Sequence, residues 1–265
     1  MTARKLNLDH PDSDYVNDLM HNSIVQHNNN IPLNSYSLIN VFKIDDPMRS
    51  SKFWDRIKRM KRKLGMFQEI NVLFHGTPKA WDIIEDGFNV AHSSEENMFG
   101  KGVYFTDKSS KANQYSWGAN QGCPRHNDIA CDVCVRRMLI CKCSMGRKFK
   151  PSYPKEPVPP GHHSVEADPH SNGDIARFLV HPEFVFFSKH QVLPLYLVEY
   201  RIKLKRQGRY VSPPPPFGRP VPVPRYNYSQ SSSSGSSRGP SYQSSYRSQP
   251  VYDSSSSDED EYYYY

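Results

Sequence analysis

The sequence predicts one α+β domain over residues 1–206, followed by a low-complexity tail over 207–265. The chain mixes strand patterns with segregated amphipathic helices and ends in a run of strands, which favours the α+β class. The last strand pattern, over 191–203, has two alternating faces from Tyr196 onward. From Gln207 onward the composition changes to Pro, Ser and Tyr without the apolar periodicity that a core needs. We therefore expect the tail to be disordered.

The first half of the domain predicts two strands and two helices. Phe53, Ile57, Met60 and Leu64 follow the spacing of one helical face. A second helix is bracketed by Thr77 as N-cap, Pro78 as its first residue and Gly87 just past its end, and carries Trp81 and Ile84 inward. The expected order is strand 36–44, helix 51–64, strand 70–74 and the helix starting at Pro78.

The second half predicts mostly short elements and one long strand. The expected order is strand 103–106, helix 109–115, half-buried strand 138–144, strand 184–187, a turn at 188–190 and strand 191–203. In the last strand, one face consists of Tyr196, Val198, Tyr200 and Ile202, and the other of Leu197, Glu199, Arg201 and Lys203.

Positive charge is concentrated in the helix predicted over 51–64. The chain has a formal net charge of +7, and the five arginines and five acidic residues of the tail cancel, so the excess belongs to the domain. The cations of this helix are Lys52, Arg56, Lys58, Arg59, Lys61, Arg62 and Lys63. Two interpretations remain open: the solvated outer face of an amphipathic helix, or a patch that attracts nucleic acid or an acidic partner.

Four potential metal ligands form two close pairs in the segment 122–134. Cys123 and His126 are separated by two residues, and so are Cys131 and Cys134. Zn²⁺ favours tetrahedral thiolate and imidazole ligation, and this spacing lets a tight turn point both side chains of a pair at one ion. Because the protein fills all four positions, we expect a structural zinc rather than a catalytic one. The alternative is a reduced cluster without metal.

The other two cysteines, Cys141 and Cys143, lie in a predicted strand, where buried structural thiols are expected. No secretory signal pattern follows Met1, and no apolar run approaches the length of a membrane span. We therefore expect a protein of the nucleus or cytoplasm that is not secreted, makes no disulfides and does not cross a membrane.

Three segments carry a family resemblance: Leu73-Phe-His-Gly-Thr77, Met98-Phe-Gly-Lys-Gly-Val-Tyr-Phe-Thr-Asp107 and Glu183-Phe-Val-Phe-Phe187. With them the sequence resembles the catalytic domain of the poly(ADP-ribose) polymerase family, and the tankyrases most closely. The likeness spans about residues 36–202 and reaches back to a helix near 14–27. It implies an ADP-ribosyltransferase-type fold with packed antiparallel sheets. The ankyrin repeats and oligomerising domain of tankyrases have no counterpart in these 265 residues.

The resemblance implies a cleft that binds NAD⁺ as substrate. Its catalytic residues are carried over as His75, Tyr104 and Glu183. His75 would bond the adenine-side ribose and Gly76 would offer its backbone to the nicotinamide amide. Tyr104 and Tyr115 would stack on the nicotinamide ring. The rival carboxylate, Glu199, lies where the family does not use one for catalysis.

The implied activity is transfer of ADP-ribose from NAD⁺ to protein acceptors, with release of nicotinamide. Glu183 would stabilise the ribosyl cation, and could also polarise a bound ADP-ribose for chain extension, so single transfer and polymerisation both stay open. The family usually places a serine where this chain has Ala112. A weakly active or inactive NAD⁺-binding module is therefore an alternative, and a zinc-stapled nucleic-acid adaptor is a third class.

Overall fold

The computed structural model describes residues 1–27, 31–65, 69–170 and 173–205. The predicted tail, 207–265, lies outside these ranges. Residues Met1–Gln207 form one compact unit. Among the described residues, none of the helices combines the length and apolar character needed to span a bilayer.

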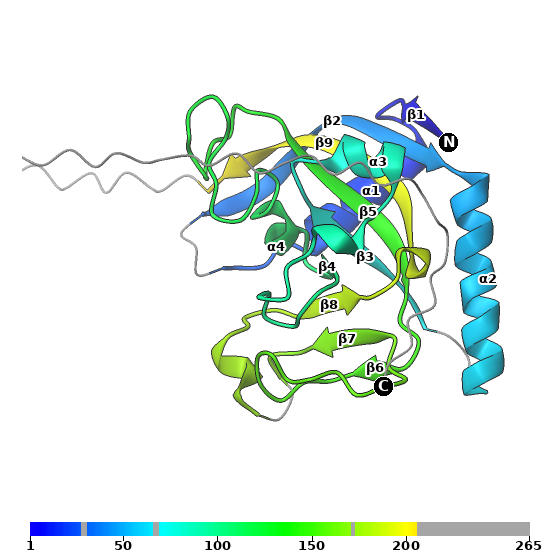
Figure 1. Cartoon of the computed structure of the whole chain (residues 1–265). Coiled ribbons are helices and arrows are strands. Elements are labelled where there is room, and N and C mark those ends of the chain that lie inside the picture. Colours follow the sequence, from blue (N-terminus) through cyan, green and yellow to red (C-terminus); the bar gives the residue numbers. More distant parts are fainter. Residues whose placement is uncertain (28–30, 66–68, 171–172, 206–265) are drawn as a thin grey trace, which may run out of the picture. The chain divides into compact units, whose positions relative to one another are not determined.

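A five-stranded antiparallel sheet is the larger of the two sheets in the domain (Figure 1). Its strands, in spatial order, are β1 (Thr2–Leu6), β2 (Leu33–Asp45), β9 (Val192–Leu204), β5 (Arg136–Ser144) and β3 (Ile70–Gly76). β9 is central and pairs with β2 and β5 along most of its length. The sequence predicted β2, β3, β5 and β9 in their places, but not the edge strand β1.

The second sheet has four short strands in the order β4 (Val103–Phe105), β8 (Glu183–Phe186), β7 (Ser164–Ala167) and β6 (Lys148–Phe149). β6 and β7 run parallel, so the expectation of antiparallel sheets is wrong for this pair. The two sheets are joined where Phe74 and Thr106 exchange backbone hydrogen bonds of 2.8 and 3.1 Å. This junction brings the end of β3 beside the end of β4.

Both faces of the large sheet are covered. α1 (Pro11–Asn22) packs Val16 and Met20 against one face of β9. That face carries Tyr196, Val198, Tyr200 and Ile202, as predicted. The opposite face packs against α3 (Ala80–Asp86) and the small sheet. As a consequence β5 is buried on both faces, and the prediction that this strand is half-buried is wrong. Its two thiols, Cys141 and Cys143, are fully buried, as predicted.

The basic helix, α2 (Pro47–Leu64), begins earlier than predicted. The Asp46 carboxylate caps it by accepting a 2.9 Å hydrogen bond from the Arg49 backbone N–H, and Pro47 occupies the first turn. The helix ends at Gly65, whose φ of 63° lies in the left-handed region. Phe53, Ile57 and Met60 are buried, which confirms the predicted apolar face.

α3 begins later than its sequence signals indicate. The Thr77 hydroxyl accepts a 3.2 Å hydrogen bond from the Lys79 backbone, two residues on, and so closes a turn instead of capping a helix. The helix starts at Ala80, which makes the prediction of Thr77 as N-cap and Pro78 as first residue wrong. Its end at Gly87 and the burial of Ile84 are as predicted.

The other helical elements are short. They are α4 (Ser109–Asn113) and three 3₁₀ turns, η1 (Val90–His92), η2 (Asp174–Arg177) and η3 (Lys189–Gln191). α4 lies beside β3, with its backbone against the end of that strand. This contact brings the helix to the junction of the two sheets.

Candidate active site

The predicted catalytic residues come from three strands that end near the junction of the sheets. His75 and Gly76 end β3, Tyr104 is the middle residue of β4, and Glu183 is the first residue of β8. β4 pairs with β8 so that Tyr104 lies opposite Val185. The Phe74–Thr106 bridge then places His75 next to Tyr104. The fold therefore gathers residues that are far apart in the sequence.

The His75 ring is held in one tautomer. Its Nδ1 lies 2.8 Å from the backbone carbonyl of Tyr104, which can only accept, so Nδ1 carries the proton. The ring packs against Phe88 and Phe105, with centroids 5.3 and 5.2 Å away. Burial lowers the pKa of His75, which favours the neutral ring. A neutral imidazole protonated at Nδ1 presents Nε2 as an acceptor.

Tyr104 is clamped through its hydroxyl. The oxygen accepts a 3.0 Å hydrogen bond from the Phe99 backbone N–H and donates one of 2.7 Å to the Gly100 carbonyl. Burial raises the pKa of Tyr104 well above its ordinary value, and the nearby Glu183 carboxylate adds to this. The phenol is therefore neutral at physiological pH, and its ring is fixed by the loop that precedes β4.

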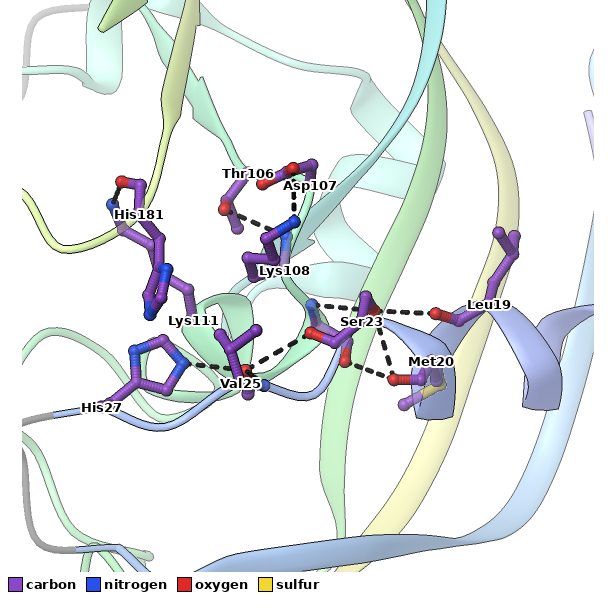
Figure 2. Close-up of polar contacts among 12 residues, drawn as sticks. Leu19, Met20, Ser23, Val25, His27, Thr106, Asp107, Lys108, Lys111 and His181 are labelled. Atoms are coloured by element: carbon purple, nitrogen blue, oxygen red, sulfur yellow. Dashed lines mark hydrogen bonds and ion pairs between the residues drawn. The ribbon is translucent and has the colours of Figure 1, made fainter. Parts of the chain in front are cut away.

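Glu183 forms a largely buried ion pair that the sequence analysis did not anticipate. Its Oε1 lies 2.8 Å from Lys111 Nζ, and the exposed fractions of the Lys and Glu side chains are 11% and 14%. The same ammonium donates a 2.8 Å hydrogen bond to the His181 carbonyl (Figure 2). Burial lowers the pKa of Lys111, while Glu183 opposes that shift. The lysine thus fixes the carboxylate and the residue two positions before it.

α4 carries Lys111 and is anchored by hydrogen bonds to the segment that contains Ser23 and Val25 (Figure 2). A five-residue helix has too few internal bonds to be stable alone. The Ser109 backbone N–H donates to the Ser23 hydroxyl at 3.2 Å. The Ser110 hydroxyl accepts from the Val25 backbone at 3.0 Å and contacts His27 Nε2 at 2.8 Å. The segment that follows α1 therefore sets the position of Lys111.

Gly76 is required because α4 lies directly against it. A Cβ atom built at this position would come within 1.7 Å of the Ala112 carbonyl oxygen, which no side chain could tolerate. Ala112 itself is only 2% exposed. The residue that departs from the family pattern thus lies against the glycine expected to bind the nicotinamide amide.

Tyr115 follows α4 and is held by its neighbours. The Tyr200 hydroxyl of β9 donates to Asn113 Oδ1 at 3.0 Å and lies 2.9 Å from the Ser116 hydroxyl. Asn113 and Ser116 are buried, whereas Tyr115 between them is exposed. Burial of part of its ring, and then Glu183, raise the pKa of Tyr115. The charge of Glu183 therefore reaches both tyrosines expected to stack on nicotinamide.

The rival carboxylate, Glu199, is engaged elsewhere. It accepts hydrogen bonds from Asn40 Nδ2 at 2.7 Å and Arg137 Nε at 2.9 Å, both on strands that flank β9. These partners place Glu199 in a cross-strand network of the large sheet rather than beside His75 or Tyr104.

The four predicted metal ligands converge. The sulfur atoms of Cys123, Cys131 and Cys134 and a ring nitrogen of His126 lie within 4.8 Å of one another. His126 Nδ1 is 3.3 to 3.5 Å from the three sulfurs. Tetrahedral zinc, with bonds of about 2.3 Å to sulfur and about 2.0 Å to nitrogen, sets such pairs about 3.5 Å apart. The residues present therefore fit one zinc ion.

The cluster is fastened to the segment that carries Tyr115. The Arg136 guanidinium lies 3.7 Å over the ring of Trp117, two residues after Tyr115, and donates to the Ile129 and Cys131 carbonyls at 2.7 and 3.2 Å. Trp117 packs with Cys123 and Cys131 in one apolar cluster. The loop that carries the four potential metal ligands thus stabilises the chain between α4 and β5.

A comparison with family models decides the family. The poly(ADP-ribose) polymerase catalytic domain matches residues 17–202. The chain belongs to this family. The match covers β3, β4, α4 and β8, and with them every residue of the site described above. Membership implies NAD-dependent ADP-ribosyltransferase activity in general, while the closer likeness to tankyrases stays a prediction.

Proposed function

We propose that this poly(ADP-ribose) polymerase catalytic domain transfers ADP-ribose from NAD⁺ to protein acceptors and releases nicotinamide. The observation that carries the proposal is the Glu183 carboxylate, which is largely buried and held at 2.8 Å by Lys111. The carboxylate is held in one place by this ion pair, at the start of β8. It is suited to stabilise positive charge that develops on a substrate.

Binding would use three kinds of group. The faces of Tyr104 and Tyr115 offer flat apolar surfaces to the nicotinamide ring. The backbone of Gly76 matches an amide by its donor and acceptor. His75 Nε2 is left as an acceptor by the Nδ1 bond to Tyr104, so it suits a ribose hydroxyl that donates. His75 and Tyr104 are held by hydrogen bonds before substrate arrives, which lowers the cost of ordering them on binding.

The chemistry breaks the bond between nicotinamide and C1′ of its ribose. The bonding electrons leave with nicotinamide, which becomes neutral, and the ribose gains oxocarbenium character. A Glu183 carboxylate bonded to the 2′-hydroxyl stabilises this charge more than it stabilises the ground state. The acceptor nucleophile then forms the new bond at C1′ and loses its proton. Lys111 acts as a positioning residue for the carboxylate.

Chain extension is the finer part of the proposal. When the acceptor is an ADP-ribose that is already attached, its 2′-hydroxyl must be polarised before it attacks. We assign this role to Glu183 as well, so one residue would serve both steps. Longer products on the modified protein would support polymerisation, and a single unit per site would support mono-transfer.

We also propose that Cys123, His126, Cys131 and Cys134 hold one structural Zn²⁺. The backbone N–H groups of His126 and Cys134 point at the sulfurs of Cys123 and Cys131, at 3.2 and 3.4 Å, and would stabilise thiolates. All four positions belong to the protein, so the metal would supply rigidity to the loop and leave no site for a reactive water.

A second candidate function is favoured by Ala112. A module that binds NAD⁺ without turnover would tolerate a weaker hold on nicotinamide, and the missing hydroxyl costs roughly 0.5–1.5 kcal/mol of binding. We favour turnover because the loss of one neutral hydrogen bond weakens a site without changing the carboxylate on which chemistry depends.

The two candidates are separated by incubating the pure protein with NAD⁺ labelled in its adenylate half. A transferase puts the label on protein and releases nicotinamide in proportion. A binding module holds NAD⁺ in a titration, yet leaves the protein unlabelled and the NAD⁺ intact. The second result would overturn the proposed function.

A further inference from the structure

A groove with a volume of about 520 Å³ lies beside the C-terminal half of α2. Its lining consists of Arg56, Arg59, Met60, Arg62, Lys63 and His163. The helix supplies all of these except His163, which lies just before β7. The groove therefore joins α2 to the edge of the small sheet and has four cations along one wall.

The groove is separate from the candidate active site. Buried residues of α2 pack with Ile70, the first residue of β3, whereas His75 and Gly76 are at the other end of that strand. A seven-residue strand spans roughly 20 Å. A ligand in the groove would therefore not contact the residues expected to bind nicotinamide.

The positive charge of the groove is not balanced by ion pairs in the part of the chain that the structure describes. Within the described residues, no carboxylate forms an ion pair with Arg56, Arg59, Arg62 or Lys63. The same helix does pair Arg49 with Asp46 and Lys58 with Asp55. Nε of Arg56 is buried and has no hydrogen-bond partner in the described part of the chain. Burial, and then Arg59, lower the pKa of Arg56.

His163 completes the groove as a donor. Its Nδ1 lies 3.2 Å from the Arg147 backbone N–H, which can only donate, so Nδ1 accepts and the neutral ring carries its proton on Nε2. Burial lowers the pKa of His163 to about 4, and the cations Arg56, Arg147 and Lys63 contribute. Because these cations lower the pKa of His163, the electrostatic potential at its ring is positive.

Helix stabilisation explains only part of this arrangement. Cations in the last turn interact favourably with the helix dipole, and this accounts for Arg62 and Lys63. It does not account for Arg56 and Arg59, which lie further from the helix end, because the effect fades beyond the last turn. Nor does it account for His163 on another element. The excess charge therefore points to an anion that the described residues do not provide.

We propose that this groove is a binding site for a phosphate-bearing ligand, with pyrophosphate as the unit that it holds. Guanidinium groups match phosphate oxygens through paired hydrogen bonds, and three arginines with one lysine exceed what a single phosphate needs. Among the described residues, the lining has no Phe, Tyr or Trp on which a base could stack, so recognition would rest on the phosphates. This inference is independent of the proposed transferase activity.

The test is a calorimetric titration of the full chain with inorganic pyrophosphate at fixed ionic strength, using two charge-matched variants. R59Q/R62Q removes two cations from the groove, and K58Q/K61Q removes two exposed cations of the same helix that do not line it. We expect R59Q/R62Q to weaken binding at least about tenfold, since hydrogen bonds to charged groups are lost. K58Q/K61Q should change binding less than about twofold, through the general charge alone.

ADP-ribose and a single-stranded oligonucleotide are the comparison ligands. If R59Q/R62Q weakens ADP-ribose binding as well, the groove takes nucleotide diphosphates; if it affects inorganic pyrophosphate alone, the groove takes the free anion. Either result supports the site. No binding of pyrophosphate to the wild type, equal losses in both double variants, or binding of the oligonucleotide alone would overturn it.

Discussion

The charged side chains at the start of β8 differ from those beside α2 in how their charge is balanced. Glu183 and Lys111 form a pair, 2.8 Å apart and largely buried, and the lysine has a second partner in the His181 carbonyl. Arg56, Arg59, Arg62 and Lys63 line a groove to which the described residues contribute no acidic side chain. Among these residues the first region has its counter-charge, whereas the second has none.

The difference indicates that the first region positions a charged group, whereas the second region attracts a ligand. A paired buried charge is held in one place, as a group that acts on a transition state must be. Unpaired cations on an open groove attract anions and lose that attraction as salt rises. We therefore expect changes at the first region to alter turnover and changes at the second to alter binding. The predictions that follow test this division.

The metal cluster should give the largest change in stability. Cys131→Ser removes one of four ligands, and because metal binding and folding of such loops are coupled, it should lower zinc content and cost several kcal/mol of folding free energy. Zinc is measured by elemental analysis and stability by thermal unfolding. Cys141→Ser is the matched control: this buried thiol is outside the cluster, so stability can fall while zinc content stays.

Loss of zinc from the Cys141→Ser protein as well would show that the metal does not depend on the four converging side chains. Protein purified without chelator that contains no zinc would remove the structural zinc altogether.

Lys111→Met should lower turnover by about tenfold or more while NAD⁺ affinity changes much less, because the carboxylate loses its fixed position. Steady-state rates and a separate binding titration give the two numbers. Lys111→Arg keeps the positive charge and should recover part of the turnover. If NAD⁺ affinity falls as much as turnover in Lys111→Met, and Lys111→Arg recovers neither, then Lys111 only stabilises the fold.

Ala112→Ser should tighten NAD⁺ binding by up to about tenfold, through one added hydrogen bond to the nicotinamide amide. Backbone atoms of Ala112 lie against Gly76, the residue expected to bind the amide. Titration with a non-hydrolysable NAD⁺ analogue measures the change. Equal affinity in both proteins would show that nicotinamide lies differently or that another group replaces the serine.

The smallest effect is expected from reversing Lys58 and Lys61 to glutamate. Both side chains are exposed and line neither the groove nor the cleft. Folding and ADP-ribose transfer should stay within about twofold of the wild type, since screened surface charges have little influence at a distance. Circular dichroism and the labelled-NAD⁺ assay check this. Loss of folding would show that this side of α2 is packed.

Much of the fold could be predicted because local patterns match what tertiary packing needs. The alternation of Tyr196, Val198, Tyr200 and Ile202 gave the correct buried face of β9. The spacing of the three cysteines and His126 predicted their convergence, since two short turns determine it. The start of α2 lies earlier than predicted because Asp46 and Pro47 form a regular start signal, whereas the apolar face on which the prediction rests begins only at Phe53.

The Lys111–Glu183 contact could not be predicted from local pattern. It depends on how α4 is held by Ser23 and Ser110, and on where the segment before β8 returns to the junction of the sheets. Neither is encoded in spacing along the chain. The groove beside α2 could not be predicted for the same reason. The cationic run is visible in the sequence, but His163, which completes the lining, lies just before β7.

The most direct test of the central claim compares Glu183→Gln with Glu199→Gln. Both changes remove one carboxylate and keep its shape, but only Glu183 lies at the junction of β3, β4 and β8. The account predicts that Glu183→Gln binds NAD⁺ nearly as the wild type does and loses turnover by on the order of 10²-fold or more, with Glu199→Gln nearly unchanged. The opposite result, with activity lost in Glu199→Gln and kept in Glu183→Gln, would contradict the assignment of the catalytic carboxylate.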